Sequence, residues 1–423
     1  MRILVEPSDY PGLLRNFGDV AMQQTTVSRI AGFWPSAKVQ ILTDKVEDLP
    51  FYAPNVDGLS AVGRHLWMSG FLRNTPVLHR LERWESQIRR RHSRLAERLT
   101  YLRARFLLSG NVAAVDSFLE ATRSADLLVI CGMGAITDVF ERYALDLLDT
   151  IGLVKANGKG FVVMFGQAFG PIQQGSAVEA RAREIMPMVD LIGLRESRVS
   201  MPLLMDLGVD PSRVMVTGDD VLEIAAHNRS SALGDGIGIN LRVASYSQVG
   251  TGKAQQLGQV LQAFVGPDSI PLVPLPSSLY PEESDTRSIE SVTHGYGHVM
   301  PNAVDSLSAL ISQLHQCRIA IVGSYHCAVF ALAQGVPVVG LYNSDYYRDK
   351  FLGLEALYEA GVFPVDLAGP KWTESFSGLL REVWDLAPRL RCGLIAAADK
   401  QIDLGWQAYN RVRKIVEQRS AGV

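Results

Sequence analysis

Short apolar runs recur along the chain between stretches of helical pattern, and this alternation restricts the fold more than any other feature. The runs are apolar on both faces, as the strands of a parallel sheet covered by helices are. Strands that alternate with helices at this spacing form βαβ units, which predicts a doubly wound α/β architecture. The runs occupy residues 2–6, 38–42, 127–131, 161–165, 191–194, 214–217, 236–240, 319–323 and 337–341.

The length of 423 residues exceeds what one core usually holds, so we expect two domains. Residues 226–235, AHNRSSALGD, are polar, rich in turn formers and without periodicity, which indicates a boundary. The sequence therefore predicts one Rossmann-like domain over residues 1–228 and another over 229–423, which ends in an amphipathic helix at 400–418. Two such domains face a cleft, where ligands bind beyond the carboxyl ends of the strands.

Composition excludes several classes of protein. A net charge of −3 argues against non-specific binding of nucleic acid. The four cysteines are scattered, with neither a CxxC pair nor zinc-like spacing, so we expect a reducing compartment and no metal site. The opening MRILVEPSDY is too short and polar for a signal peptide, and no apolar run approaches the roughly 20 residues that span a bilayer. These features predict a protein that is cytoplasmic, or at most peripheral at the inner face of a membrane.

Residues 78–108 form a basic segment with helical pattern. Between Arg80 and Arg105 it holds nine arginines and three glutamates. One interpretation is a solvated helix with a few i,i+4 ion pairs. The other is a peripheral helix that meets anionic lipid or a diphosphate-linked substrate.

The stretch GSYH at 323–326 stands between an apolar strand-like run and an apolar helical run. The first turn of a helix presents unpaired N–H groups and the positive end of the dipole, which favour phosphate or carboxylate. Ser324 could donate to such an anion, and His326 could donate a proton. The alternative is a capping serine followed by a histidine satisfied in the core.

A second polar stretch, RNFGDVA at 15–21, follows the first strand-like run. Asn16 and Gly18 suit a tight turn, and Asp19 is expected to cap a helix that begins at Val20. The alternative is a strand-to-helix turn without chemistry. Its position at the carboxyl end of a strand favours a place in the cleft.

Charged side chains follow three further strand-like runs. Arg195 comes directly after 191–194 and needs an anion or a carboxylate partner. Asp219 belongs to TGDD, which also ends a run. Arg348 and Lys350 follow 337–341 on what we expect to be a cleft loop, and two cations there suit a doubly charged anion.

The order of these motifs resembles that of the polysaccharide pyruvyl transferase family, whose members share a glycosyltransferase-B-like fold. The resemblance extends from about residue 2 to about residue 360. It rests on RNFGD in place of a GNxGD-like turn, then FGPI, LRESRVS, TGDD and HCAVFALAQGVPVVGLYN.

The resemblance implies transfer of a pyruvyl group from phosphoenolpyruvate to two hydroxyls of one sugar, which forms a cyclic ketal without a metal or redox cofactor. It places the acceptor, a saccharide that could be lipid-linked, on the first domain and the donor on the second. The implied roles are His326 as the acid, Asp19 as the base, Arg195, Ser324, Arg348 and Lys350 for the donor anion, and Asn16 and Asp219 as further substrate contacts.

The chain departs from the family at one position of the site. Ser324 stands where the family commonly has the arginine of Arg-x-His. We expect Arg348 or Lys350 to supply the missing charge. Two other functions remain open: a glycosyltransferase that uses a nucleotide sugar, and a saccharide-binding relative without catalysis.

Overall fold

The computed structural model describes residues 1–8, 15–49, 53, 56–68, 112–156, 158–266, 270–281, 283–301 and 304–421. The basic segment 78–108 lies outside these residues, so both of its interpretations stay predictions.

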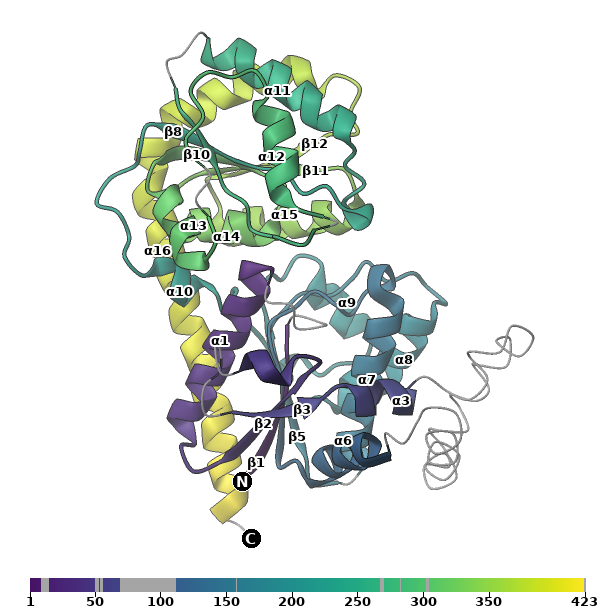
Figure 1. Ribbon diagram of the computed structural model, residues 1–423. Helices are drawn as coiled ribbons and strands as arrows, with labels where there is room; N and C mark the ends of the chain where they lie inside the picture. Colours follow the sequence, from purple (N-terminus) through teal and green to yellow (C-terminus); the bar gives the residue numbers. More distant parts are fainter. Residues whose placement is uncertain are drawn as a thin grey trace, which may run out of the picture.

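The first domain contains a parallel sheet of seven strands in the order β3-β2-β1-β4-β5-β6-β7 (Figure 1). The order reverses between β1 and β4, which is the switch point where doubly wound sheets bind ligands. The strands are β1 (Arg2–Glu6), β2 (Lys38–Thr43), β3 (Asp57–Ser60), β4 (Leu127–Ile130), β5 (Phe161–Gln167), β6 (Leu191–Leu194) and β7 (Val214–Val216).

The second domain contains a parallel sheet of five strands in the order β12-β11-β10-β8-β9, which reverses between β8 and β10. The prediction of two Rossmann-like domains is therefore confirmed. The strands are β8 (Gly236–Asn240), β9 (Leu272–Pro274), β10 (Cys317–Val322), β11 (Val338–Tyr342) and β12 (Val362–Asp366).

Helices cover both faces of each sheet (Figure 1). In β4, Leu128 and Ile130 pack into one apolar cluster, whereas Leu127 and Val129 pack into another on the opposite face. This double burial explains why the strands appear as continuous apolar runs. The α-helices are α1 (Phe17–Phe33), α3 (Val62–Met68), α6 (Val112–Ser124), α7 (Glu141–Ala156), α8 (Ala177–Ile185), α9 (Ser200–Asp206), α10 (Leu222–Ala226), α11 (Thr251–Val265), α12 (Asp285–Thr293), α13 (Leu307–Leu314), α14 (Tyr325–Ala333), α15 (Asp345–Tyr358) and α16 (Trp372–Ala421). The 3₁₀ helices are η1 (Val46–Asp48), η3 (Asp138–Phe140), η4 (Met186–Met188), η5 (Pro211–Arg213) and η6 (Ser245–Ser247).

Helix α16 runs from the second domain back along the first (Figure 1). Its 50 residues contain the amphipathic helix predicted at 400–418. Near its start Phe376 packs on the core of the second domain. Near its end the ring of Tyr409 stacks on Phe165 of β5 at 3.7 Å between centroids, and its hydroxyl donates to Asp220 at 3.0 Å. The chain thus crosses between the domains after β7 and again along α16. None of the described helices has the length and apolar character needed to cross a membrane.

Candidate active site

A cavity of about 560 Å³ lies between the domains, beyond the carboxyl ends of β1, β6, β8 and β10. Six of the eight side chains predicted for the site line it. The first domain contributes Asn16, Asp19 and Arg195, and the second contributes Ser324, His326 and Lys350. The structure therefore brings together residues that lie more than 300 positions apart in the sequence.

Asn16 begins the helix that carries Asp19. Helix α1 starts at Phe17, and the Oδ1 of Asn16 accepts a hydrogen bond from the Gly18 amide at 3.1 Å. The prediction that Asp19 caps a helix from Val20 is therefore wrong, because Asn16 supplies the cap three residues earlier. Asp19 lies instead in the first turn of α1, where the helix dipole favours a carboxylate.

Ser324 occupies the cap position of α14, but its side chain makes no capping bond. Its hydroxyl forms a hydrogen bond with the Ser277 hydroxyl at 2.9 Å, and its amide donates to Asn240 Oδ1 at 2.9 Å. The alternative in which Ser324 is a capping serine is therefore wrong. The amide of Ala328 donates to the Ser324 carbonyl, which is the first hydrogen bond of the helix. Tyr325 and His326 therefore occupy the first turn, where backbone amides have no acceptor within the helix.

The side chain of His326 is largely buried, but one of its ring nitrogens lacks a hydrogen bond. Its side chain is 11% exposed, and its Nε2 lies 3.9 Å from Asp219 Oδ2, too far for a hydrogen bond. Nε2 is buried with no hydrogen-bond partner among the described residues. Burial lowers the pKa of His326 well below its usual value, and the charges of Arg195, Lys350 and Arg242 lower it further. The imidazole is therefore neutral near pH 7 while the cavity holds no anion.

Arg195 is buried at the floor of the cavity, directly after β6. Its guanidinium lies over the ring of Tyr325 at 4.3 Å, and its Nη1 is 3.4 Å from Asp219 Oδ2. Asp219 lies behind Arg195 and is not among the residues that line the cavity. Its position therefore disagrees with the predicted substrate contact and fits a partner that holds Arg195 in place.

Lys350 and Arg348 point in different directions. The segment that we predicted as a cleft loop continues as helix α15, capped by Ser344, and residues two apart on a helix face different sides. Lys350 lines the cavity and donates to the Tyr346 hydroxyl at 2.7 Å, whereas Arg348 pairs with Asp345 and Asp349 outside it. Arg348 therefore does not supply the missing charge. Burial lowers the pKa of Lys350 well below its usual value, and Arg195 adds to this effect.

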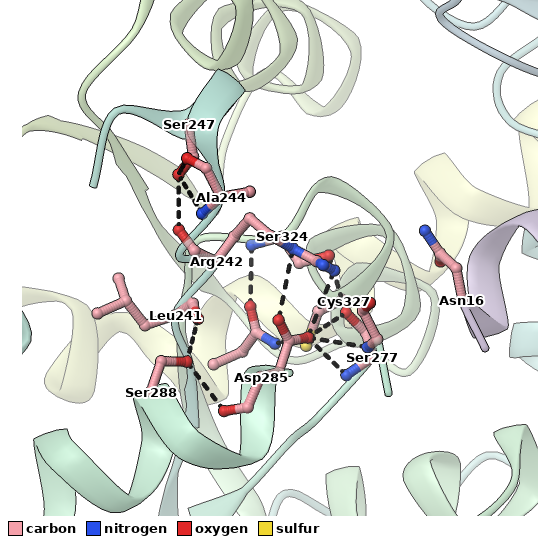
Figure 2. Close-up of polar contacts among 12 residues, drawn as sticks. Asn16, Leu241, Arg242, Ala244, Ser247, Ser277, Asp285, Ser288, Ser324 and Cys327 are labelled. Atoms are coloured by element: carbon pink, nitrogen blue, oxygen red, sulfur yellow. Dashed lines mark hydrogen bonds and ion pairs between the residues drawn. The ribbon is translucent and has the colours of Figure 1, made fainter. Parts of the chain in front are cut away.

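Arg242 is a site residue that sequence reasoning missed. It follows β8, is buried and lines the cavity, and its Nε and Nη2 each lie 3.4 Å from an oxygen of Asp285 (Figure 2). The signal was present, because Arg242 follows a strand run much as Arg195 does.

Aromatic side chains form the wall beside these cations. Phe140 of the first domain meets Tyr246 and Tyr346 of the second edge to face, at 5.6 and 5.7 Å between ring centroids. Gly134, after β4, leaves room for the guanidinium of Arg195, since a Cβ there would lie 2.8 Å from Arg195 Nη2. No periodicity in the sequence marks Phe140, Tyr246 or Gly134. Within the described ranges, no group of three or more His, Cys, Asp or Glu residues is placed to hold a metal ion.

The profile of the polysaccharide pyruvyl transferase family matches residues 16–345, from the cap of α1 to the start of α15. The chain belongs to the polysaccharide pyruvyl transferase family. The resemblance of the motifs is thereby confirmed, and the matched region includes Arg195, Arg242 and His326. Lys350 lies just beyond it. Among curated proteins, none matches the chain.

Solved structures similar to this pyruvyl transferase family member show the fold alone, because their sequence identity is low. Alr3699/HepE from Anabaena in complex with UDP has 10% identity and a TM-score of 0.56, with 99% of each chain covered. A glycosyltransferase from Rickettsia africae has 11% identity and a TM-score of 0.54, with 98% of each chain covered. The UDP-GlcNAc 2-epimerase from Neisseria meningitidis bound to UDP-GlcNAc has 12% identity and a TM-score of 0.53, covering 96% of this chain and 100% of that one. The predicted glycosyltransferase-B-like fold is confirmed.

His326 makes the free energy of unfolding depend on pH in a defined direction. An unfolded imidazole has a pKa of about 6.5, whereas burial lowers the pKa of the folded imidazole well below that. Below about pH 6.5 the unfolded state binds more protons than the folded state. The free energy of unfolding therefore decreases as the pH is lowered, by at most about 1.4 kcal/mol per pH unit from this group. We expect His326→Asn to flatten the profile measured by urea unfolding from about pH 7.5 to about pH 5. His294→Asn, at an exposed position, is the control, and equal slopes for wild type and His326→Asn would contradict a buried neutral imidazole.

Proposed function

We propose that the protein transfers the pyruvyl group of phosphoenolpyruvate to two hydroxyls of one sugar in a cell-surface or exopolysaccharide precursor, forming a cyclic ketal. Membership of the family supports a transferase. The observation that carries the proposal is the convergence of Arg195, Arg242 and Lys350 beside the first turn of α14 and His326. A small, highly charged anion fits this arrangement.

Phosphoenolpyruvate carries a carboxylate and a phosphate, both of which suit the forked guanidinium of arginine. Arg195 comes from the first domain and Arg242 from the second, so a donor held by both would bridge the cleft. Arg195 Nε and His326 Nε2 are buried without a hydrogen-bond partner among the described residues. Buried polar atoms without a hydrogen-bond partner are rare, and a bound ligand would complete these two.

Arg242 also supports donor binding despite Ser324. The Ser324 hydroxyl forms a hydrogen bond with the Ser277 hydroxyl (Figure 2). The amide and hydroxyl of Ser277 donate to Asp285, which in turn pairs with Arg242. The site thus has a network of small polar groups where the family has an arginine, and an arginine at the end of β8 beside it. In the proposed site Arg242 and Lys350 supply the charge that Ser324 lacks.

The reaction begins with protonation of the methylene carbon of the donor by His326. The adjacent carbon becomes cationic, and one sugar hydroxyl forms a C–O bond to it while Asp19 accepts the hydroxyl proton. The bond from that carbon to the phosphate oxygen then breaks, and inorganic phosphate leaves. The second hydroxyl adds to the same carbon and gives its proton to His326, which closes the ketal and restores the acid. The proton on Asp19 passes to the departing phosphate, which leaves as the hydrogen phosphate dianion. Arg195 and Arg242 stabilise the charge on the phosphate as it leaves.

His326 must be protonated to act as the acid, although it is neutral in the free protein. A bound dianion offsets the repulsion from Arg195, Arg242 and Lys350, so it raises the pKa of the imidazole. In this scheme donor binding causes His326 to take up a proton from solvent, and His326 then transfers that proton to the donor. No metal or redox cofactor takes part in these steps.

The acceptor is expected on the side of α1, where Asn16 and Asp19 line the cavity. A lipid-linked saccharide and a peripheral place at the cytoplasmic face of the membrane fit the basic segment 78–108. The rival function is a nucleotide-sugar-dependent glycosyltransferase, since Alr3699/HepE of the same fold was solved with UDP.

Ligand-dependent melting separates these functions. We expect phosphoenolpyruvate to raise the melting temperature by mass action and UDP to do so less. Inorganic phosphate should then be released from phosphoenolpyruvate only when a saccharide with two suitably placed hydroxyls is present. Stabilisation by UDP but not by phosphoenolpyruvate would favour the glycosyltransferase, and binding of saccharide without phosphate release would favour a non-catalytic relative.

Three substitutions distinguish the proton transfer by His326 from the binding of the donor anion by Lys350. We expect His326→Asn to lower turnover by roughly 10²- to 10⁴-fold while donor affinity stays within a few fold, as removal of a general acid does. Lys350→Met should weaken donor binding by about tenfold or more, because a charge-assisted hydrogen bond contributes about 1.5–3 kcal/mol. Arg348→Met removes a cation from the same helix outside the cavity and is the matched control. Equal losses for Lys350→Met and Arg348→Met would contradict the assignment of Lys350.

A further inference from the structure

A buried carboxylate organises the donor side of the cavity. Asp285, at the start of α12, is fully buried. Its Oδ2 accepts hydrogen bonds from Asn240 Nδ2, the Ser277 amide and the Ser278 amide, each at 2.9 Å, and from the Ser277 hydroxyl at 3.0 Å (Figure 2). So many bonds to one charge fix the loop at 277–278 relative to β8.

This loop of the second domain is paired with the start of α1 in the first domain. The Phe17 amide donates to the Ser277 carbonyl at 3.0 Å, and the Leu279 amide donates to the Arg15 carbonyl at 2.7 Å. Asn16 and Ser278 thereby form an antiparallel bridge. We call this pairing of residues 15–17 with 277–279 the interdomain bridge. It holds the first turn of α1 against the mouth of α14.

Gly18 lies where these two helix ends meet. A Cβ on Gly18 would lie 2.0 Å from Cγ and 2.1 Å from Nδ1 of His326, closer than real atoms approach. Gly18 is a residue of α1, and its φ is not in the left-handed region. The predicted role of Gly18 in a tight turn is therefore wrong. The glycine is needed for close approach and not for backbone conformation.

We propose that Gly18 is a positioning residue, whose lack of a side chain lets α1 bring Asp19 to His326 across the cleft. The interdomain bridge holds the helix at that distance. The contact itself is independent of the reaction, and only its role in placing the acid and base rests on the proposed function. A side chain at position 18 would separate the two groups and admit water to the imidazole.

The surroundings of His326 provide a readout for this contact. The titratable groups that face it are Asp219 after β7, Arg195 after β6, Arg242 after β8 and Lys350 of α15. From α1, Gly18 contributes burial alone at the point of contact, and Asp19 follows it on the cavity wall. Displacing α1 would hydrate the imidazole and move its pKa up toward the ordinary value.

The substitution Gly18→Ala tests the contact, and Gly32→Ala is the matched control. Both glycines belong to α1, but a Cβ at Gly32 meets no atom within 4 Å. Alanine has a higher helix propensity than glycine at both positions, so any loss of stability or activity at position 18 reflects the contact with His326. We expect Gly18→Ala to lower turnover at least tenfold, with a smaller change in donor affinity, and to raise the pKa of His326 by at least one unit in a ¹³C NMR titration assigned with His326→Asn. Gly32→Ala should match wild type in all three measurements.

A double-mutant cycle with His326→Gly completes the test, because it removes the Cβ, Cγ and Nδ1 atoms that the new Cβ would meet. Gly18→Ala should lower the melting temperature in the wild-type background but not in the His326→Gly background. A Gly18→Ala protein that fails to fold, together with a double variant that folds, gives the same support. Equal effects in both backgrounds, or an unchanged His326 titration, would overturn the inference. These two readouts need no substrate, so a failure of the proposed pyruvyl transfer would leave them intact.

Discussion

The site depends on the crowding of positive charge in a buried cavity. Arg195 and Arg242 keep their charge because Asp219 and Asp285 pair with them from behind, at 3.4 Å. In the part of the chain that the structure describes, the recorded carboxylate pair of His326 is longer, at 3.9 Å, and none is recorded for Lys350. Burial beside the arginines lowers the pKa of both. Charge buried in this way is costly unless it is paired. An anion in the cavity therefore relieves the repulsion and restores the protons, which couples donor binding to the readiness of the acid.

The fold places these charges by the ends of its strands. Arg195 follows β6 and Arg242 follows β8, so one cation comes from each sheet, and His326 stands in the first turn of the helix after β10. Contacts that hold the domains together include the packing of α16 on β5, the interdomain bridge at the start of α1, and Phe140 against Tyr246 and Tyr346. Since Asp285 holds both Arg242 and the loop of that bridge, the donor side and the closing contact share one buried carboxylate.

All nine strands predicted from apolar runs are present, whereas β3, β9 and β12 were not predicted. These three lie at sheet edges, and their sequences DGLS, LVP and VFPVD are short or interrupted by polar residues and proline. An edge strand needs less burial and tolerates proline, so it lacks the apolar run that marks a central strand. Arg195 and His326 could be predicted as site residues because each follows a strand-like run. The different directions of Arg348 and Lys350 could not be predicted, because their segment was expected to be a loop and is a helix. The need for glycine at position 18 could not be predicted either. It comes from His326 of the other domain, more than 300 residues away, and the sequence around Gly18 does not indicate that contact.

Calorimetry of donor binding tests the central claim most directly. Phosphoenolpyruvate is titrated into the protein near pH 7.5 in two buffers with different enthalpies of ionisation, and the difference in heat gives the protons taken up. We predict net proton uptake in wild type, because the donor raises the pKa of His326 and Lys350, and a smaller uptake in His326→Asn. Binding without proton exchange, or with equal uptake in both proteins, would contradict the claim that the donor protonates its own acid.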